Sequence, residues 1–431
     1  MKENFLHFVW QHQYFSKQEL TASTGESVHI LHPGSYNSNA GPDFLNSKIR
    51  IGNVEWAGNV EIHYNASDWF AHEHEQNTAY DNVVLHVVWK NNKEALRKDG
   101  TTIPAIELKG RVDEKLINNY SALVKAKDVI PCQSSFVQVA EIKKVSMLEK
   151  ALMQRLQRKA EDVKELLDKN NKDWEETAYQ CLAKSFGFKV NNEPFLRLSK
   201  AVPYKIVKKH CNSNLQVEAL LFGAAGLLEK NYKDDYPNSL KKEFEFLEKK
   251  YSLSDKKLNE SEWKFLRVRP ANFPTTRISE FCALLSTVPH LFSLFTEEIS
   301  YDSVFQKLSP TVSSYWENHY IFDKEVKRKP QQMGKASVYN IIINTIAPLL
   351  VCYGKETGED SYIDKAVRLI ETLPAEDNAI TRQWREVGLV VKDASGSQGA
   401  IELYNNYCKT KSCLWCTIGT DIVNSSWNQQ L

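Results

Sequence analysis

The sequence predicts an α+β protein in which a small mixed β-sheet near the N-terminus is followed by a large all-helical region. Between about residues 27 and 112, short runs rich in β-branched and aromatic residues are bounded by Gly, Asn or Pro, as strands are. Beyond residue 112, apolar residues recur three and four positions apart over long stretches, which is typical of amphipathic helices. We therefore expect two domains, an α/β domain over residues 1–112 and a helical region over residues 113–431.

The expected elements of the first domain alternate between helices and strands. The helices are the N-terminal segment and residues 67–80, and the strands lie at 28–36, 47–64, 82–90 and 102–110. This order of helix, strands, helix and strands indicates a mixed sheet. In the second part, expected helices cover 141–169, 174–188 and 215–230, and prolines at 131, 270, 274 and 330 interrupt the pattern.

The composition is that of a folded globular protein, with 42% hydrophobic, 25% charged and 11% aromatic residues, and it excludes a disordered chain. A chain of 431 residues is too long for one core, because cores stop growing at roughly 250 to 300 residues. The formal charge of +1 means that any contact with nucleic acid requires a local basic patch. The N-terminus lacks the features of a signal peptide, and no apolar run reaches about 18 residues, so we expect a cytoplasmic protein without a membrane span.

The most informative stretch concentrates acidic residues and histidines. Its members are Asp43, Glu61, His63, Asp68, His72, His74, Asp81 and His86. Glu61 and His63 are two positions apart on an expected strand, so they face the same side of the sheet. Asp43 and Glu61, at the ends of adjacent strands, can hold Mg²⁺ or Mn²⁺ through carboxylate oxygens. Such an ion lowers the pKa of a bound water molecule, which His63 would orient or deprotonate.

Pro42-Asp43, followed after 17 residues by Glu61-Ile62-His63, resembles the motif of the PD-(D/E)XK nuclease superfamily with His in place of the Lys. The order of expected helices and strands also fits that superfamily, and Gln76 and Tyr80 match the Q-x-x-x-Y of its RecB-like branch. The resemblance implies a restriction-endonuclease-like fold and a metal-dependent phosphodiesterase acting on DNA or RNA. Its implied catalytic residues here are Asp43, Glu61 and His63. Lys48 is a candidate for the role of the missing Lys.

The same residues allow two other interpretations. His63, His72, His74 and a carboxylate have the composition of a zinc site with an open water position, which would serve a hydrolase of a substrate other than nucleic acid. Alternatively, the cluster is a structural network, and the protein is a non-catalytic scaffold that binds nucleic acid or protein. His86, inside an apolar run, is more often a core histidine than a ligand.

Three of the eight cysteines form a second cluster, C-x4-C-x2-C, at Cys408, Cys413 and Cys416. The C-x2-C spacing lets one tight turn present two thiolates to the same metal. A fourth ligand is needed, and Cys132 is the first candidate because it lies in a turn-like segment, whereas the other cysteines fall inside apolar helical patterns. The bound group would be zinc or a four-iron cluster. The alternative is three free thiols near a C-terminal turn.

Arg267, Arg269 and Arg277 surround a proline-rich loop that also carries aromatic residues. Guanidinium groups suit phosphates and aromatic rings stack on bases, so this loop is a candidate surface for nucleic acid. The alternative is that these arginines cap helix ends and pair with acidic residues of neighbouring helices.

Over nearly its full length the chain resembles an uncharacterised family of the domain-of-unknown-function kind. The residues that carry this resemblance include Gly41-Pro42-Asp43-Phe44, the run from Gly58 to His63, the run 269–274 and the run from Cys413 to Gly419. The resemblance implies one shared fold and says nothing about the substrate. The sequence indicates no particular protein partner.

Overall fold

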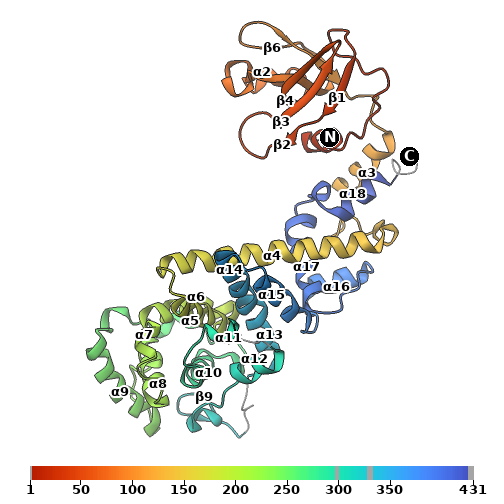
Figure 1. Cartoon of the computed structure of the whole chain (residues 1–431). Coiled ribbons are helices and arrows are strands. Elements are labelled where there is room, and N and C mark those ends of the chain that lie inside the picture. The colour runs from red at the N-terminus through yellow and green to blue at the C-terminus, as the bar shows by residue number, and fades with distance from the viewer. Residues whose placement is uncertain (1, 297–299, 328–332, 426–431) are drawn as a thin grey trace. The chain divides into compact units, whose positions relative to one another are not determined.

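The computed structural model describes residues 2–296, 300–327 and 333–425. The chain forms two compact units (Figure 1). The first unit consists of Met1–Met147, Gln383–Leu389 and Leu403–Leu431, and the second of Leu148–Arg382 and Val390–Glu402. The C-terminal segment therefore belongs to the same unit as the N-terminal sheet.

A six-stranded mixed sheet forms the first unit's framework, which confirms the sheet expected from the sequence. Its strands are β1 (Val28–His32), β2 (Ser35–Tyr36), β3 (Phe44–Ile51), β4 (Val54–Asn65), β5 (Val83–Lys90) and β8 (Ala105–Glu107). The order is β1-β3-β4-β5-β8, and β2 pairs with β3. β3 is antiparallel to β1 and β4, whereas β5 runs parallel to β4 and β8. A separate ribbon joins β6 (Ala95–Leu96) and β7 (Thr102–Ile103).

The hairpin of β3 and β4 brings Asp43 and Glu61 together. Ile51 pairs with Val54, so the turn contains two residues, and the first of them, Gly52, takes a φ of +58° that glycine adopts without strain. The register continues to the pair of Phe44 and Val60, so Asp43, just before β3, lies beside Glu61 on β4. The centre of β4 is buried on both faces, and α1 (Glu3–Gln11) packs against this strand.

The connection from β4 to β5 carries His72 and His74. Because the two strands are parallel, the chain has to cross over between them. It does so through α2 (Asp68–Ala71), η1 (His74–Gln76) and η2 (Thr78–Tyr80). The single helix expected over 67–80 is therefore three short helical turns, because Glu73 adopts a left-handed φ of +56° that interrupts the helix.

The C-terminal segment packs on α3 (Glu114–Lys125) within the first unit. The segment contains η9 (Tyr404–Cys408), η10 (Cys413–Trp415) and α18 (Thr417–Asn424), and η3 (Phe136–Gln138) follows α3 in the chain. Asn119 on α3 donates a hydrogen bond to the carbonyl oxygen of Ile422 at 3.2 Å. The Lys411 ammonium group donates to the carbonyl oxygen of Ala126 at 2.8 Å. These bonds fasten the end of the chain to the segment that follows the sheet.

The second unit is a helical assembly around one apolar core. Its helices are α5 (Trp174–Phe186), α6 (Phe188–Ala201), α7 (Tyr204–Val207), α8 (Asn214–Ala224), α9 (Asp235–Tyr251), α10 (Pro274–Thr287), α11 (Ser293–Thr296), α12 (Tyr301–Leu308), α13 (Lys335–Ile341), α14 (Ala347–Thr357) and α15 (Ser361–Glu371). Three helices have residues in both units: α4 (Glu141–Lys169), α16 (Ala379–Glu386) and α17 (Ala394–Leu403). A small ribbon of β9 (His319–Ile321) and β10 (Lys324–Glu325) departs from the all-helical expectation. Short turns complete the unit at η4 (Ser254–Lys256), η5 (Glu260–Glu262), η6 (Pro270–Asn272) and η7 (Ser314–Glu317).

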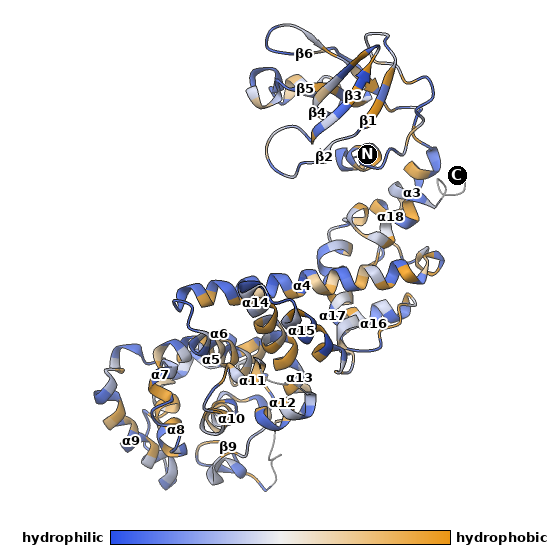
Figure 2. Ribbon diagram, in the orientation of Figure 1, coloured by the Kyte–Doolittle hydropathy of each residue, from blue (hydrophilic) through white to orange (hydrophobic). Residues whose placement is uncertain are grey.

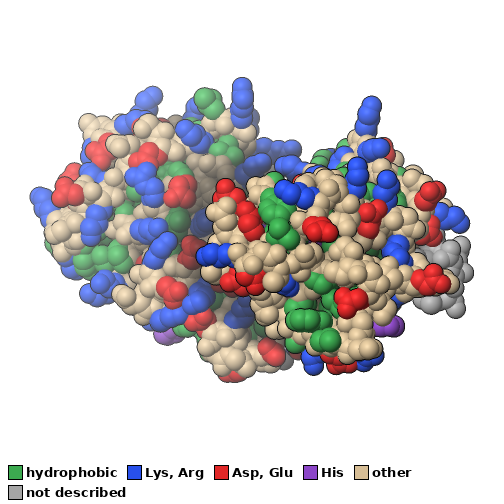
Figure 3. All heavy atoms as spheres, turned by 90° about the horizontal axis from the view of Figure 1, so that it is seen from above, with side chains coloured by type: hydrophobic (Ala, Val, Ile, Leu, Met, Phe, Trp, Pro, Cys, Tyr) green, Lys and Arg blue, Asp and Glu red, His purple; other side chains and the backbone are tan. Residues whose placement is uncertain are grey.

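A continuous apolar helix, Lys335–Thr357, runs through the core of the second unit. It contains α13, the π-helical turn η8 (Ile342–Ile346) and α14, and by length and composition it could cross a membrane. This corrects the expectation that no stretch is so long and apolar. In its most apolar window, 67% of the helix is buried inside the unit, as in the core helix of a soluble protein. Figure 2 shows the apolar residues along α13 and its neighbours, and Figure 3 shows basic and acidic side chains interspersed on one face.

Candidate metal centres

Asp43 and Glu61 hold each other in position at the junction of β3 and β4. The backbone N–H of Asp43 donates to Glu61 Oε2 at 3.0 Å, and the N–H of Ile62 donates to Asp43 Oδ2 at 3.0 Å. These two bonds fix both carboxyl groups, and the second oxygen of Glu61, Oε1, faces the histidines. The structure thus brings together the pair that the motif predicts, with Asp43 bonded to backbone and Glu61 turned toward nitrogen donors.

Burial dominates the electrostatics of Glu61, which is 5% exposed. Burial raises the pKa of Glu61 to about 9, and the negative charge of Asp43 adds to the shift. In the metal-free protein this carboxyl group is therefore protonated at neutral pH. A bound cation reverses this preference, because its positive charge offsets the cost of ionising a buried carboxyl group.

Three histidine rings converge near Glu61 Oε1. His63 Nε2 lies 3.6 Å from this oxygen, and His74 Nε2 lies 3.3 Å from it. His63 Nε2 also lies 3.2 Å from His72 Nδ1, and donor nitrogens of the three histidines all lie within 4.8 Å of one another. Ligand atoms bonded at 2.0–2.1 Å to a tetrahedral ion lie about 3.3 Å apart. The three histidine nitrogens are close enough to be candidates for sharing one ion, and a nitrogen donor set favours a transition metal such as zinc over magnesium.

The buried histidines are neutral, which is the form that binds a metal. Burial and the neighbouring histidines lower the pKa of His63 to about 2. Burial lowers the pKa of His86, which is 0% exposed, to about 3. His86 Nε2 lies 2.8 Å from His63 Nδ1, so the tautomer that donates from His63 Nδ1 leaves His63 Nε2 available to an ion. His86 is therefore a core residue that also orients a candidate ligand.

Aromatic rings enclose the buried side of the histidine cluster. Tyr80 stacks on His74 with ring centroids 3.9 Å apart, and Trp69 packs edge-on against His74 at 5.4 Å. Burial, together with the negative charges of Glu61 and Asp43, raises the pKa of Tyr80 to about 12. His72, by contrast, is exposed. The cluster is thus closed by aromatic rings on one side and reaches solvent at His72.

The remaining polar residues of this stretch lie away from the convergence point. Asp68 Oδ2 accepts a hydrogen bond from the N–H of Asn65 at 2.9 Å, at the start of α2. Asp81 is exposed. Lys48 is exposed on β3, where the alternating neighbours Ser47 and Ile49 are buried, so its ammonium group points away from the buried face of that strand.

His7 joins the cluster although the sequence analysis did not select it. His7 lies on α1, and its Nε2 is 3.2 Å from Asp43 Oδ2. Both ring nitrogens of His7 are buried without a hydrogen-bond partner among the described residues, so its approach to Asp43 is an ion-pair contact and not a hydrogen bond. A histidine beside a carboxylate whose ring nitrogens are not engaged in hydrogen bonds is a candidate general base. The sequence gives little signal for this role, because His7 meets Asp43 only through the packing of α1 on the sheet.

The four candidate cysteines meet around one small cavity in the first unit. Cys132 lies in the turns after α3, Cys408 ends η9, and Cys413 and Cys416 lie at the start and just past the end of η10. The structure pairs none of these four described cysteines in a disulfide, all four are 6–7% exposed, and they line a cavity of about 10 Å³ together with Trp384. The structure therefore places Cys132 with the C-terminal trio, as the need for a fourth ligand predicts.

Burial holds the thiols of Cys132, Cys408 and Cys413 in their protonated form. Burial and the nearby sulfurs of Cys416 and Cys413 raise the pKa of Cys132 to about 12. Burial and Cys416 raise the pKa of Cys413 to about 11, and the pKa of Cys408 shifts in the same direction. Four sulfurs that disfavour one another's ionisation gain most from a metal, because the metal replaces the protons and neutralises the thiolates.

A glycine allows the backbone to close around the cysteine cluster. A Cβ at Gly419 would lie 2.2 Å from the carbonyl oxygen of Cys413. Glycine is therefore required where α18 approaches η10. This close approach explains the glycine that follows the C-x2-C step in the sequence.

The family of proteins of unknown function described as DUF2851 matches residues 3–379. The chain belongs to this family. No curated protein and no solved structure matches it. The matched range contains the histidine cluster and Cys132, and it ends before Cys408. Because the family's description gives no activity, the function has to be argued from the chemistry of the sites.

In this family member the three candidate arginines lie in two kinds of environment. Arg277 is 3% exposed, and its guanidinium group donates to Glu280 and Asn272. Arg277 is thus held by packing, but its acidic partner lies three residues on in the same helix, α10, and not on a neighbouring helix as the alternative expected. Arg267 and Arg269 are exposed in the segment before η6. These two remain candidates for contact with phosphate.

Proposed function

We propose that the first unit is a metal-dependent hydrolase of phosphodiester bonds in DNA or RNA, with one zinc or manganese ion bound by His63, His72 and His74 and the fourth position left for water beside Glu61. The observation that carries the proposal is the convergence of three histidine nitrogens, which lie within 4.8 Å of one another, with His63 Nε2 and His72 Nδ1 3.2 Å apart. The two carboxylates led us to expect magnesium or manganese. Because the donors that converge are nitrogens, a transition metal is favoured over magnesium.

Two features support nucleic acid as the substrate. The chain order of helix α1, strand β1, the strand after Pro42-Asp43, the strand with Glu61 and His63, helix α2 and strand β5 agrees with the resemblance to the PD-(D/E)XK superfamily and its restriction-endonuclease-like fold. The exposed Arg267 and Arg269 suit phosphate groups. Arg277 does not serve this role in the proposal, because its guanidinium group is buried and hydrogen-bonded.

Each residue of the site has a separate role in the proposed reaction. His63, His72 and His74 would hold the ion, which when bound would lower the pKa of a water molecule and neutralise charge on the phosphate. His63 serves as a ligand and not as the expected base, because a pKa of about 2 leaves it too weak to accept a proton at neutral pH. Asp43 orients Glu61 through its backbone N–H and pairs with His7. His7 Nδ1 is the proton acceptor in this arrangement.

Metal-dependent cleavage tests the proposal. The full-length protein, stripped with EDTA and reloaded, should cleave single- or double-stranded DNA or RNA with Zn²⁺ or Mn²⁺ and less well with Mg²⁺. Glu61→Gln and His63→Ala should reduce cleavage to background. Lys48→Ala, at an exposed position of β3, is the matched control and should leave cleavage unchanged.

Each other outcome selects a different function. Cleavage that persists in both Glu61→Gln and His63→Ala removes the proposal. Tight metal binding with hydrolysis of esters or peptides, and none of nucleic acid, supports the zinc hydrolase of another substrate. Binding to nucleic acid or protein without turnover in any metal supports the non-catalytic scaffold.

We also propose that Cys132, Cys408, Cys413 and Cys416 bind a structural zinc ion or four-iron cluster. Four thiolates leave no open position for a substrate, which makes the centre structural. A reducing compartment such as the cytoplasm keeps these thiols available. Metal analysis of protein purified with and without oxygen separates the two groups: zinc alone indicates the ion, whereas iron, sulfide and a visible absorbance indicate the cluster. Protein that contains neither under both conditions contradicts the proposal.

A further inference from the structure

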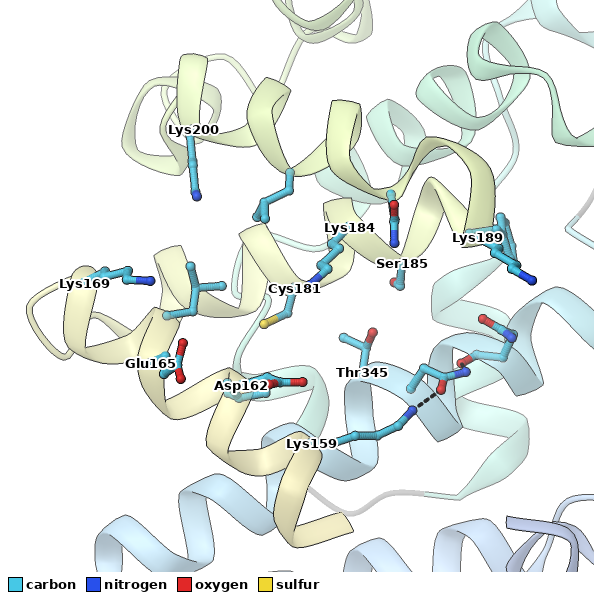
Figure 4. A pocket seen from close by; sticks show the side chains of 17 residues that line it. Lys159, Asp162, Glu165, Lys169, Cys181, Lys184, Ser185, Lys189, Lys200 and Thr345 are labelled. Carbon is cyan, nitrogen blue, oxygen red and sulfur yellow. Dashed lines mark hydrogen bonds between the residues drawn. The ribbon is translucent and has the colours of Figure 1, made fainter. Parts of the chain in front are cut away.

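A cavity of about 580 Å³ lies in the second unit, between α4, α5, α6 and the apolar helix Lys335–Thr357 (Figure 4). Small-ligand sites commonly enclose about 300–1,000 Å³. The cavity is separate from the two clusters of the first unit, so an inference about it does not depend on the proposed hydrolase.

Lysines dominate the charged lining of this cavity. Five lysines line it against two acidic residues: Lys159, Lys169, Lys184, Lys189 and Lys200, with Asp162 and Glu165. Figure 4 shows Lys169, Lys184 and Lys200 pointing into the cavity. In the described part of the chain, none of the five lysines forms an ion pair with a carboxylate. The cavity is therefore a concentration of uncompensated positive charge.

Nearby lysines outside the cavity behave differently. Lys172 lies 2.6 Å from Asp168 and 2.7 Å from Glu356, and Lys164 lies 3.2 Å and 3.1 Å from the same two residues. The carboxylates of this surface thus neutralise lysines that do not line the cavity. Among the described residues, the lysines that line the cavity have no such carboxylate partner and can therefore bind an anionic ligand.

Lys159 extends the positive charge to the inner wall. It is partly buried, and its ammonium group donates to Asn344 Oδ1 on the π-helical turn η8. Burial and the positive charges of Arg155 and Arg158 lower the pKa of Lys159 to about 7. An anion bound beside Lys159 would raise the pKa of its ammonium group again. Binding of the anion and protonation of Lys159 therefore favour each other.

The uncharged residues that line the cavity also have features of a ligand-binding site. Phe188 holds a φ of +48°, a strained conformation for an aromatic residue, and η8 is a π-helical turn. Both irregularities line the cavity, and such strain is retained where a ligand requires it. Leu196 adds an apolar wall, and the side-chain amide nitrogen of Asn192 can donate a hydrogen bond, whereas the Asn344 amide is bonded to Lys159 and to the carbonyl oxygen of Asn340.

We propose that this cavity binds a nucleoside di- or triphosphate. The lysines are placed to hold the phosphates, and Phe188, Leu196 and the amide of Asn192 form the wall for the base. The two carboxylates on α4, Asp162 and Glu165, suit the Mg²⁺ ion that such a ligand carries. A simple anion would not require the apolar and amide wall.

Equilibrium binding to the full-length protein tests this site, with ATP, GTP and inorganic triphosphate as probes in the presence of Mg²⁺. We expect one nucleotide per chain and weaker binding at higher salt. Lys184→Glu/Lys200→Glu should weaken nucleotide binding by about 30-fold or more, because two attractive charges become repulsive. The matched control, Lys209→Glu/Lys242→Glu, changes the same charge at exposed positions outside the cavity and should alter affinity by less than about twofold.

The remaining outcomes overturn the proposal. Absence of saturable binding by ATP and GTP at low salt removes it, as does an equal loss of affinity in both double variants. If inorganic triphosphate binds as tightly as the nucleotides, the cavity does not recognise the base, which contradicts the proposal. If single-stranded oligonucleotides displace the nucleotide and bind far more tightly, the ligand of the cavity is a nucleic-acid strand and not a free nucleotide. Thermal melting of each variant shows that the helical unit is still folded.

Discussion

The histidine cluster and the cysteine cluster lie in the same unit, but their donor atoms differ in kind and in access to solvent. The histidine cluster mixes nitrogen with one carboxylate oxygen, and it reaches the surface at the exposed His72. The cysteine cluster offers four sulfurs, each 6–7% exposed, around a cavity of about 10 Å³. A metal in the first cluster can keep a position for water, whereas a metal in the second cannot.

The two clusters also differ in how the chain assembles them. Glu61, His63 and His74 come from one strand and the crossover that follows it, so the sheet and its next connection place them. Cys132 and the C-terminal trio come from segments several hundred residues apart in sequence. The first cluster therefore depends on local folding, and the second fastens distant parts of the chain, as a structural metal does.

The largest expected effect is on catalysis at the histidine cluster. His74→Ala removes a nitrogen that lies 3.3 Å from Glu61 Oε1. We expect kcat/KM for metal-supported cleavage to fall about 1,000-fold, because losing the ion costs several kcal/mol and each 1.4 kcal/mol is a factor of ten. His29→Ala, at an exposed position of β1, is the control. Equal losses in both variants would contradict a specific role for His74.

The next effect is on stability at the cysteine cluster. Cys413→Ser removes one of four ligands, and we expect about 3 kcal/mol of lost stability, which lowers the melting temperature by roughly 6–12 °C. Cleavage by the folded protein at 25 °C should change little. Cys211→Ser, at a partly exposed position in the other unit, should leave the melting temperature unchanged. Loss of cleavage without loss of stability would reverse the assignment of the two clusters.

The metal-free clusters should weaken the fold at opposite ends of the pH scale. The folded pKa values of about 2 for His63 and 3 for His86 lie below the ordinary histidine value of 6.5, so unfolding takes up protons and stability falls as pH drops below 6.5. Glu61 acts in the opposite sense, because its folded pKa of about 9 lies above the ordinary 4.5 and its contribution to stability is lost as pH rises from 4.5 to 9. For Cys132 and Cys413 the folded values of about 12 and 11 lie above 9.0, so stability falls as pH rises above 9. Urea unfolding in EDTA across pH should show both arms, each with a slope of up to about 1.4 kcal/mol per proton per pH unit.

Variants that remove the titrating residues test which groups cause each loss of stability with pH. His63→Asn/His86→Asn should flatten the acid arm and leave the alkaline arm unchanged. An acid arm that persists in this variant would mean that other groups control stability at low pH.

The smallest expected effect concerns the orientation of a ligand. His86→Leu keeps the core apolar and removes the Nε2 atom that lies 2.8 Å from His63 Nδ1. We expect the metal affinity to fall about tenfold, as for other residues that orient a metal ligand. Competition with a fluorescent chelator measures this change. An affinity within twofold of the unchanged protein would show that His63 needs no such partner.

Much of the histidine cluster could be predicted because it follows from strand geometry. Alternation along β4 places Glu61 and His63 on one face, and the crossover to a parallel strand brings His72 and His74 close to it. The helix expected over 67–80 was too long, because the left-handed turn at Glu73 has no strong sequence signal. His7 could not be predicted, since its role depends on the packing of α1.

The same limit applies to the helical unit. The basic loop at Arg267, Arg269 and Arg277 is evident in the sequence, but the burial of Arg277 depends on its contacts with Glu280 and Asn272. The lysines of the cavity are dispersed over α4, α5 and α6, and a periodic helix pattern does not show which exposed residues will share a cavity. Spacing along the chain predicts neighbours on one element, whereas tertiary packing decides the rest.

Because the first unit includes residues before Leu148 and residues from Leu403 onward, it is complete only after the segment from Leu403 has been synthesised. A ribosome adds roughly 5–20 residues per second, so Cys132 waits some tens of seconds before Cys408, Cys413 and Cys416 emerge. During that time its thiol and the docking surface of α3 lack their partners. A nascent chain that ends prematurely would keep this surface exposed, so truncated products would differ from the finished protein in a feature that cellular proteases and chaperones recognise.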